Sequence, residues 1–263
     1  SGDSFFYTTV YDNTVGYQNW KWEFEITRER LRGIVEQQSG EKLALLEIGA
    51  GNGSFVKKLL NGDFDQISIC TTEYSEVGKA EIEKLGIKCL GNEIWEFSEE
   101  SEEKNKFDFI CMFQVLEHMD DFDRTFKSIS ALSNDGAHLF IAVPSNIHRE
   151  YFEQLGFIED VPPTHISRWN KESFMFAGEK YGWDMIEHSV EPNRLHTNIA
   201  KILTFKYKDH KRVKWVNSIQ NQYLRKLSKL LIYTPFLLIN IPIMLPMRNE
   251  ALGVVQWVMF KKL

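Results

Sequence analysis

The chain has few cysteines, few prolines and no long uninterrupted apolar run. The shortage of cysteine and the lack of a long apolar run each exclude a class of protein. Its three cysteines, Cys70, Cys89 and Cys111, are an odd number without the spacing of a disulfide framework or a metal site. We therefore expect free thiols in a reducing compartment, which excludes a disulfide-stabilised secreted domain. The most apolar segment, residues 230–245, is shorter than the ~20 residues that a membrane-spanning helix needs and contains two prolines. It is therefore not expected to span a bilayer.

Composition and charge narrow the choice further. The 263 residues are 43% hydrophobic and 26% charged, which is typical of a globular protein with a sizeable core. The formal net charge is −6 and the chain shows no recognisable nucleic-acid-reading module, so we expect no nucleic acid partner. The N-terminus is polar and aromatic, with no apolar signal segment. We expect a cytoplasmic protein, with the inner face of the membrane as a second option.

The most informative segment leads from an apolar strand through alternating glycines into a helix. Gly49, Gly51 and Gly53 lack the Cβ atoms that would keep a ligand away from the backbone N–H groups. The pattern is E-x-G-x-G-x-G, with Glu47 two residues before the first glycine. It differs from the dinucleotide fingerprint G-x-G-x-x-G and lacks the Gly-Lys-Ser/Thr ending of a phosphate loop. The alternative without a ligand is a tight strand-to-helix turn.

Two further segments follow this loop in an order typical of a cofactor-binding domain. Residues 67–73 predict a second strand that ends in Glu73, roughly two dozen residues after the loop. A carboxylate at this spacing can accept hydrogen bonds from a ribose diol. Residues 107–113 (FDFICMF) predict a fourth strand, which leads directly into residues 114–119 (QVLEHM).

Together, the glycine loop and residues 107–119 resemble the class I S-adenosylmethionine (SAM)-dependent methyltransferases. The resemblance is to the ubiquinone-biosynthesis-like and the surface-polysaccharide or sugar methyltransferase group. It covers the chain from about Trp20 to the C-terminus, with the motifs concentrated between Leu45 and Asn146. It implies SAM as the cofactor, S-adenosylhomocysteine as the product, and no metal.

The resemblance also implies which residues contact the cofactor. Glu47 and the loop backbone would serve the methionine end of SAM, and Glu73 the ribose. Asn92 follows the short third strand, where the family keeps a polar side chain, often Asp, near the adenine amino group. Tyr11 would contact the methionine carboxylate or close the acceptor pocket, the alternative being that it packs a cap onto the sheet. The predicted cofactor set is Glu47, Gly49, Ala50, Gly51, Asn52, Gly53, Glu73, Tyr74, Asn92, Glu93, Phe113, Gln114 and Tyr11.

Predicted strands alternate with predicted helices along the chain, which indicates a parallel sheet covered on both faces. We therefore expect an α/β, Rossmann-like, seven-stranded, mostly parallel sheet with an N-terminal aromatic cap and a helical insertion before the last strand. Beyond the strands named above, strands are expected at 87–90, 137–143, 183–190 and 251–260, and helices at 23–37, 55–60, 75–85, 122–132 and 173–181. The expected parts are cap helices at 1–40, a methyltransferase core at 41–195, an insertion at 196–248 and a final core strand at 249–263.

Methyl transfer to an oxygen or nitrogen requires somewhere for the acceptor's proton to go, and histidine suits this task near neutral pH. His118 is expected at the start of the helix after the fourth strand. His165 follows Pro162 and Pro163 in a loop after the fifth strand. We prefer His165 as the base, because the two prolines would hold it rigidly over the open end of the sheet. The alternatives are packing beside the cofactor for His118 and a loop hydrogen bond for His165.

The insertion at 196–248 begins with a basic part and ends with an apolar part, residues 230–245. The expectation we prefer is a lid or dimer contact whose apolar face is covered by packing on the sheet. The alternative is contact of residues 201–246 with an anionic membrane surface. The chain as a whole is expected to methylate a small polar acceptor, foremost an oxygen of a sugar or surface-glycan precursor in polysaccharide biosynthesis. The alternatives are a ubiquinone-type aromatic O-methyltransferase and a non-catalytic SAM-binding scaffold protein.

Overall fold

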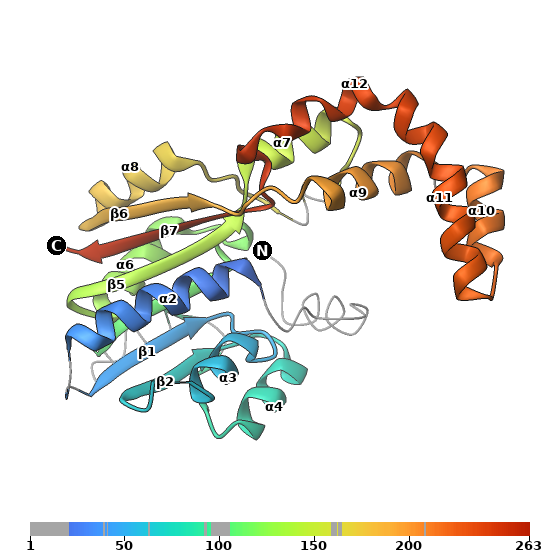
Figure 1. The fold of residues 1–263 in the computed structure, drawn as a ribbon. Coiled ribbons are helices and arrows are strands. Elements are labelled where there is room, and N and C mark those ends of the chain that lie inside the picture. The colour runs from blue at the N-terminus through green and yellow to red at the C-terminus, as the bar shows by residue number, and fades with distance from the viewer. Residues whose placement is uncertain are drawn as a thin grey trace. The chain divides into compact units, whose positions relative to one another are not determined.

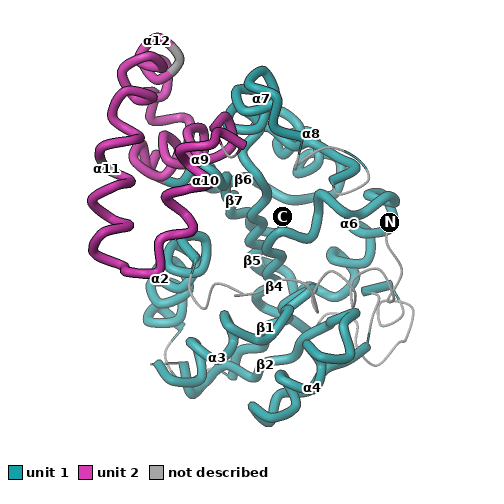
Figure 2. The backbone as a smooth tube through the Cα atoms, turned by 90° about the vertical axis from the view of Figure 1, so that its right-hand side faces the viewer, with its two compact units in different colours: residues 1–191, 254–263 teal, residues 192–253 magenta. Residues whose placement is uncertain are grey.

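The computed structural model describes residues 21–38, 40, 42–62, 64–91, 94–95, 106–158, 162, 165–207 and 209–263. The chain divides into two compact units, which Figure 2 distinguishes by colour. The first comprises residues 1–191 and 254–263, and the second comprises residues 192–253. Each unit is described by itself below.

The first unit is built on one seven-stranded sheet with the strand order β3-β2-β1-β4-β5-β7-β6 (Figure 1). Strands β1 to β5 pair in parallel, whereas β7 runs antiparallel to both β5 and β6. This confirms the predicted Rossmann-like, seven-stranded, mostly parallel sheet. The strands are β1 Leu43–Ile48, β2 Ile67–Thr72, β3 Lys88–Cys89, β4 Phe107–Phe113, β5 Ser133–Pro144, β6 Trp183–Val190 and β7 Val255–Lys262.

Helices cover both faces of the sheet, because its central strands are apolar on both sides. One buried cluster joins the sheet to α2, α3 and α4, and a second joins it to α6 and α8. The continuous apolar sequence of β4 is typical of a parallel strand buried on both faces. The helical elements of this unit are α2 Trp22–Gln37, α3 Ser54–Leu60, α4 Glu76–Lys84, η2 Leu116–His118, α6 Phe122–Leu132, α7 Asn146–Gln154 and α8 Lys171–Tyr181.

Several boundaries differ from those expected from the sequence. Strand β5 starts at Ser133 rather than at residue 137, since Ser133 pairs with Phe107 of β4; the register then shifts before His138, and Gly136 has a φ of 74°. Helix α7 was not expected, although the Ser145 side chain caps it by accepting from the N–H of His148. The last strand begins at Val255 rather than at residue 251. All three cysteines are described and are free thiols, as expected.

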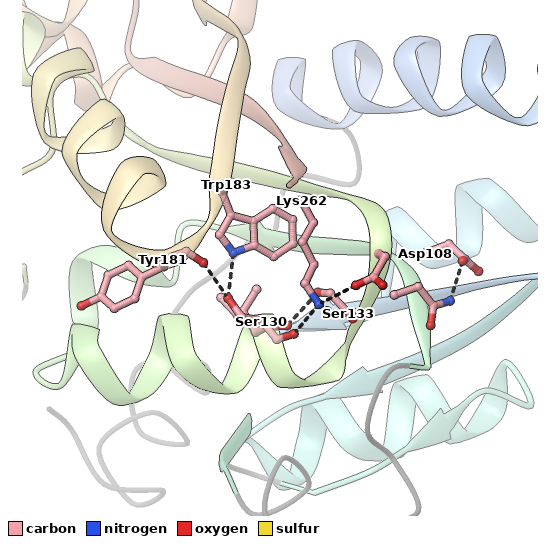
Figure 3. Close-up of polar contacts among 9 residues, drawn as sticks. Asp108, Ser130, Ser133, Tyr181, Trp183 and Lys262 are labelled. Carbon is pink, nitrogen blue, oxygen red and sulfur yellow. Dashed lines mark hydrogen bonds and ion pairs between the residues drawn. The ribbon is translucent and has the colours of Figure 1, made fainter.

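Polar contacts fasten the amino ends of the parallel strands, away from the glycine loop (Figure 3). The Nζ of Lys262, on β7, donates to the carbonyl oxygens of Ser130 at 2.9 Å and Ser133 at 2.8 Å. The Trp183 Nε1 donates to the Ser130 Oγ at 2.9 Å. Asp108, in the FDFI segment, accepts from the Ala44 N–H and from Asn134 Nδ2, so it joins three strands. Asp108 therefore has a structural role.

The second unit is helical. It contains α9 Leu195–Tyr207, α10 Lys211–Ser218, α11 Gln222–Ile239, α12 Ile241–Met244, η3 Pro246–Arg248 and η4 Glu250–Leu252. The Asn240 side chain is buried and ties α11 to α9, donating to the Tyr207 hydroxyl at 2.7 Å and accepting from Lys206 Nζ at 2.7 Å. Among the described residues, no helix has both the length and the apolar character needed to cross a membrane.

Candidate active site

The candidate site lies at the carboxyl ends of the parallel strands, where open α/β sheets bind ligands. The loop from Gly49 to Gly53 joins β1 to α3, and its three glycines have φ values of 67°, 59° and 72°. A Cβ on Gly49 would lie 2.6 Å from the Val115 side chain. Any other residue at this position would therefore be strained and would collide with the segment after β4.

The carboxylate of Glu73 holds this loop in place. Glu73 directly follows β2, and its Oε2 accepts from the Gly51 N–H at 2.6 Å while its Oε1 accepts from the Ser75 N–H at 2.8 Å. Burial raises the pKa of Glu73, and the two backbone hydrogen bonds oppose that rise. Gly78 completes the contact, since a Cβ there would lie 2.6 Å from the Gly51 carbonyl oxygen. Each carboxylate oxygen keeps a second acceptor position, so a ribose diol could still donate to it.

Glu47 lies on the central strand β1 and is buried. Its Oε2 has no hydrogen-bond partner among the residues that the structure describes. Burial is the main cause that raises the pKa of Glu47 well above its usual range; the nearby Glu73 raises it further and Lys21 lowers it. An orphaned buried carboxylate oxygen is costly, and a ligand carrying positive charge or N–H donors would satisfy it.

A third buried acid, Glu23, was not predicted as a site residue. It lies in the first turn of α2 and its pKa is raised, mainly by burial. The Gln114 Nε2 donates to Glu23 Oε1 at 3.4 Å, and Gln114 itself holds a positive φ of 58°, a strained backbone for a residue that is not glycine. No local sequence signal distinguishes Glu23, because an acid in an amphipathic helix is identified as a site residue only by what covers it.

The remaining predicted cofactor residues have less distinctive surroundings. Phe113 is buried and packs edge-on against Phe24 and Phe55, so its ring belongs to the core. Asn52 accepts from the Ser54 hydroxyl at 2.7 Å inside the loop. Ala50 is buried, and its N–H donates to the Thr72 carbonyl, whereas Tyr74 is half-buried beside Glu73. Tyr11, Asn92 and Glu93 lie outside the described residues.

The two candidate histidines come together in space. The rings of His118 and His165 lie 4.7 Å apart between centroids, and the His165 Nε2 lies 4.0 Å from Glu117 Oε1. Two backbone hydrogen bonds create this arrangement, because Ile166 and Ser167 donate their N–H groups to the Glu117 carbonyl at 3.0 and 3.2 Å. The site therefore contains both histidines and the buried Glu117, which the sequence analysis left out.

One detail of the histidine prediction is wrong. His118 does not begin a long helix but ends the single turn η2, Leu116–His118, and α6 begins only at Phe122. The turn is short because Asp121 caps α6 by accepting from the Arg124 N–H, which places the helix start after His118. Of the two prolines near His165, Pro163 lies outside the described residues.

Glu117, His118 and His165 are also the ligand types that bind divalent metals. Each offers one donor atom, and these atoms lie within 4.8 Å of one another. Two ligands of one tetrahedral zinc lie about 3.4 Å apart at ordinary bond lengths. His165 Nε2 and Glu117 Oε1, at 4.0 Å, would have to approach each other to share an ion. The observed spacing suits an acid–base pair better than a formed metal centre.

Comparison with known proteins places this geometry in a family. The methyltransferase domain family matches residues 22–188, well over half of the chain. No curated protein matches the sequence.

Solved structures with the same fold cover nearly the whole chain at low identity. A SAM-dependent methyltransferase from Archaeoglobus fulgidus is similar with a TM-score of 0.57 and 16% identity, covering 98% of this chain and 99% of that chain. A putative sarcosine dimethylglycine methyltransferase from Galdieria sulphuraria gives 0.54 and 13%, with 98% and 97% covered. The CurJ carbon methyltransferase gives 0.54 and 13%, with 91% and 54% covered. The chain belongs to the methyltransferase domain family, and the predicted class I methyltransferase identity is confirmed.

Proposed function

We propose that this methyltransferase transfers the methyl group of SAM to a hydroxyl oxygen of a small polar acceptor, foremost a sugar or a surface-glycan precursor. The observation that carries the proposal is the pairing of His118 and His165 beside the buried Glu117, next to the loop that Glu73 fastens. A hydroxyl acceptor must lose a proton during transfer, whereas a carboxylate or thiolate acceptor need not. A lipid-carried glycan precursor would be methylated at the inner membrane face.

The described residues fit SAM as the cofactor. SAM supplies an electrophilic methyl group on a sulfonium and also carries an ammonium group. Three acids of the candidate site, Glu23, Glu47 and Glu73, are buried, and the Glu47 Oε2 has no hydrogen-bond partner among the described residues, so a donor on a ligand would satisfy it. Glu47 would accept from the ammonium and Glu73 from the ribose diol. Buried carboxylates with raised pKa values become better ionised when a cation binds beside them.

His118 and His165 act on the methyl acceptor. Transfer of the methyl group that SAM would supply requires the acceptor hydroxyl to lose its proton as its oxygen is methylated. His165 accepts this proton, and the Glu117 carboxylate 4.0 Å away stabilises the imidazolium that forms. His118 lies against His165 and positions it. A general base contributes typically ~10²–10⁴-fold, and alignment of the two reactants supplies much of the rest.

The first prediction concerns cofactor choice. Calorimetry should show binding of both SAM and S-adenosylhomocysteine by the metal-free protein, with far weaker binding of NAD and ATP. The reason is that the loop lacks the dinucleotide and phosphate-loop spacings. Tight NAD binding without any response to SAM would contradict the proposed cofactor. Acceptor screening with nucleotide sugars against phenolic quinone precursors would then separate the sugar proposal from an aromatic acceptor.

The second prediction concerns Glu73. Glu73→Gln leaves a single acceptor oxygen on a neutral side chain, so one of the two backbone bonds to Gly51 and Ser75 weakens. SAM affinity should fall by about 10- to 150-fold, the equivalent of about 1.5–3 kcal/mol for hydrogen bonds to a charged group. Glu73→Ala should also lower the unfolding free energy. The matched control is Glu76→Gln, an exposed acid in the next helical turn, which should leave both quantities unchanged.

The third prediction separates two effects of Glu47. The fold favours its protonated form, so this contribution to stability is complete below the ordinary glutamate pKa and is lost as pH rises through the raised value. Glu47→Gln imitates the protonated form. Denaturant unfolding of the cofactor-free protein should therefore show a variant that gains stability over the native chain as pH rises from ~4 to ~7.

The same Glu47→Gln variant should bind SAM more weakly, because the amide cannot neutralise an ammonium group. Glu81→Gln, an exposed carboxylate on α4, serves as the control for both measurements. A Glu47→Gln variant that binds SAM as tightly as the native chain would remove Glu47 from the cofactor site, whatever its stability.

The fourth prediction tests the base. His165→Ala should lower kcat by about 10²-fold or more while SAM affinity stays nearly intact, since a base acts on the transition state. Glu117→Gln should cause a smaller loss of kcat, and the exposed His196→Ala should cause none. If His118→Ala abolishes turnover while His165→Ala does not, the two roles are reversed.

Chelation distinguishes the acid–base pair from a metal centre at the same residues. Turnover should survive dialysis against EDTA, and added Mg²⁺, Mn²⁺ or Zn²⁺ should not raise it. Loss of activity on chelation, restored by a divalent ion and abolished in His165→Ala and Glu117→Gln alike, would instead assign the three side chains as metal ligands.

A further inference from the structure

Basic charge is concentrated in the second unit. Residues 192–253 contain eleven lysines and arginines and only two carboxylates, Asp209 and Glu250, a formal charge of +9 in a chain whose net charge is −6. The rest of the chain is therefore strongly acidic. This uneven distribution of charge favours binding of an anionic partner to residues 192–253. It disfavours binding of an anionic partner to the rest of the chain.

Helix α11 of this unit carries an exposed apolar stripe. Leu224, Leu227, Leu231 and Leu238 are 57%, 58%, 68% and 59% exposed. Their spacings of three, four and seven residues place them on one helix face. Two of these leucines, Leu231 and Leu238, belong to the apolar segment 230–245. Tyr223 on the same helix and Trp215 on α10 are exposed as well.

The stripe faces outward because another face of α11 is already occupied. Phe236 stacks on Tyr207 of α9 with ring centroids 3.9 Å apart and also contacts His210 edge-on. Asn240, just after α11, is buried and bonded to Lys206 and Tyr207. The orientation of α11 within its own unit is thus fixed by contacts that leave the four leucines uncovered.

Basic side chains occupy the face of α11 opposite the leucines, on the same side as Phe236 but two to three turns before it. Arg225, Lys226 and Lys229, with Gln222, recur at helical spacings and line a surface hollow of about 330 Å³. At 100° per residue, this row lies on the side of the helix away from the four leucines. A helix with a leucine face and a lysine- and arginine-rich polar face is typical of interfacial helices, which lie in the plane of a bilayer.

We propose that residues 192–253 dock on the surface of an anionic phospholipid bilayer. The leucine stripe of α11 enters the boundary of the acyl region, and Arg225, Lys226 and Lys229 contact the headgroup phosphates. Contact is peripheral, since no described helix spans a membrane. The inference does not depend on the methyl acceptor. Only an anionic bilayer uses both features at once, because a second copy would bring two strongly basic surfaces together and nucleic acid would leave the leucines exposed.

The test is co-sedimentation of the full chain with sucrose-loaded vesicles, without SAM or acceptor. Binding is expected to vesicles that contain phosphatidylglycerol and not to phosphatidylcholine alone. It should fall when salt rises from about 0.1 M to about 1 M, which shortens the Debye length from about 10 Å to about 3 Å. Because neither cofactor nor acceptor is present, this result is independent of the proposed function.

Two sets of variants with matched controls assign the binding to α11. Replacing Arg225, Lys226 and Lys229 together by Gln should weaken binding about 100-fold, the equivalent of about 1 kcal/mol for each charge. Replacing Lys57, Lys84 and Lys171 of the first unit by Gln removes the same charge and should leave binding unchanged.

The double variant Leu227→Glu and Leu231→Glu should weaken vesicle binding at least 10-fold, whereas Phe176→Glu, an exposed aromatic on α8, should not. These side chains are exposed, so circular dichroism should show unchanged helix content. Absence of sedimentation with anionic vesicles at low salt would overturn the proposal, as would equal losses in the control variants. A dimer in light scattering that Leu227→Glu and Leu231→Glu convert to a monomer would assign the stripe to a second copy instead.

Discussion

The site depends on the buried carboxylate of Glu73, which accepts hydrogen bonds from two separate backbone segments. It accepts from the Gly51 N–H in the loop after β1 and from the Ser75 N–H at the start of α4. These two bonds fix the position of the glycine loop relative to α4. Glycines at 51 and 78 are what permit the approach, since a Cβ at Gly78 would overlap the Gly51 carbonyl oxygen. A carboxylate that is both desolvated and hydrogen-bonded by the backbone is rigid, and rigidity is what a cofactor loop requires.

Buried acidic side chains are a second feature of the candidate site. Glu23, Glu47 and Glu73 are all buried and all have raised pKa values, and Lys21 acts on the first two of them. This arrangement opposes folding in the absence of a ligand, because burial of each carboxylate is unfavourable. A cationic ligand bound beside these carboxylates would offset part of this cost, which is the physical reason to expect a positively charged cofactor there.

The sequence predicted the sheet, the loop and Glu73, because strand hydrophobicity and glycine spacing are local signals. It did not predict Glu117 as a site residue, since its approach to His165 depends on the backbone bonds from Ile166 and Ser167, nearly fifty residues away. Glu23 was missed for the same reason: an acid in an amphipathic helix is distinguished only by what covers it. The partner of the apolar segment 230–245 could not be predicted either, because periodicity defines an apolar face without defining what covers it.

The separation of basic and acidic residues along the chain favours one orientation in the proposed contact with a membrane. An anionic bilayer attracts residues 192–253 and repels the acidic remainder of the chain, so contact through any other part is electrostatically disfavoured. The proposed contact therefore uses residues 192–253 and not the acidic remainder of the chain. Under these two proposals the acids that would favour a cationic cofactor and the basic residues that would favour an anionic surface belong to separate parts of the chain, so neither set of charges neutralises the other's proposed ligand.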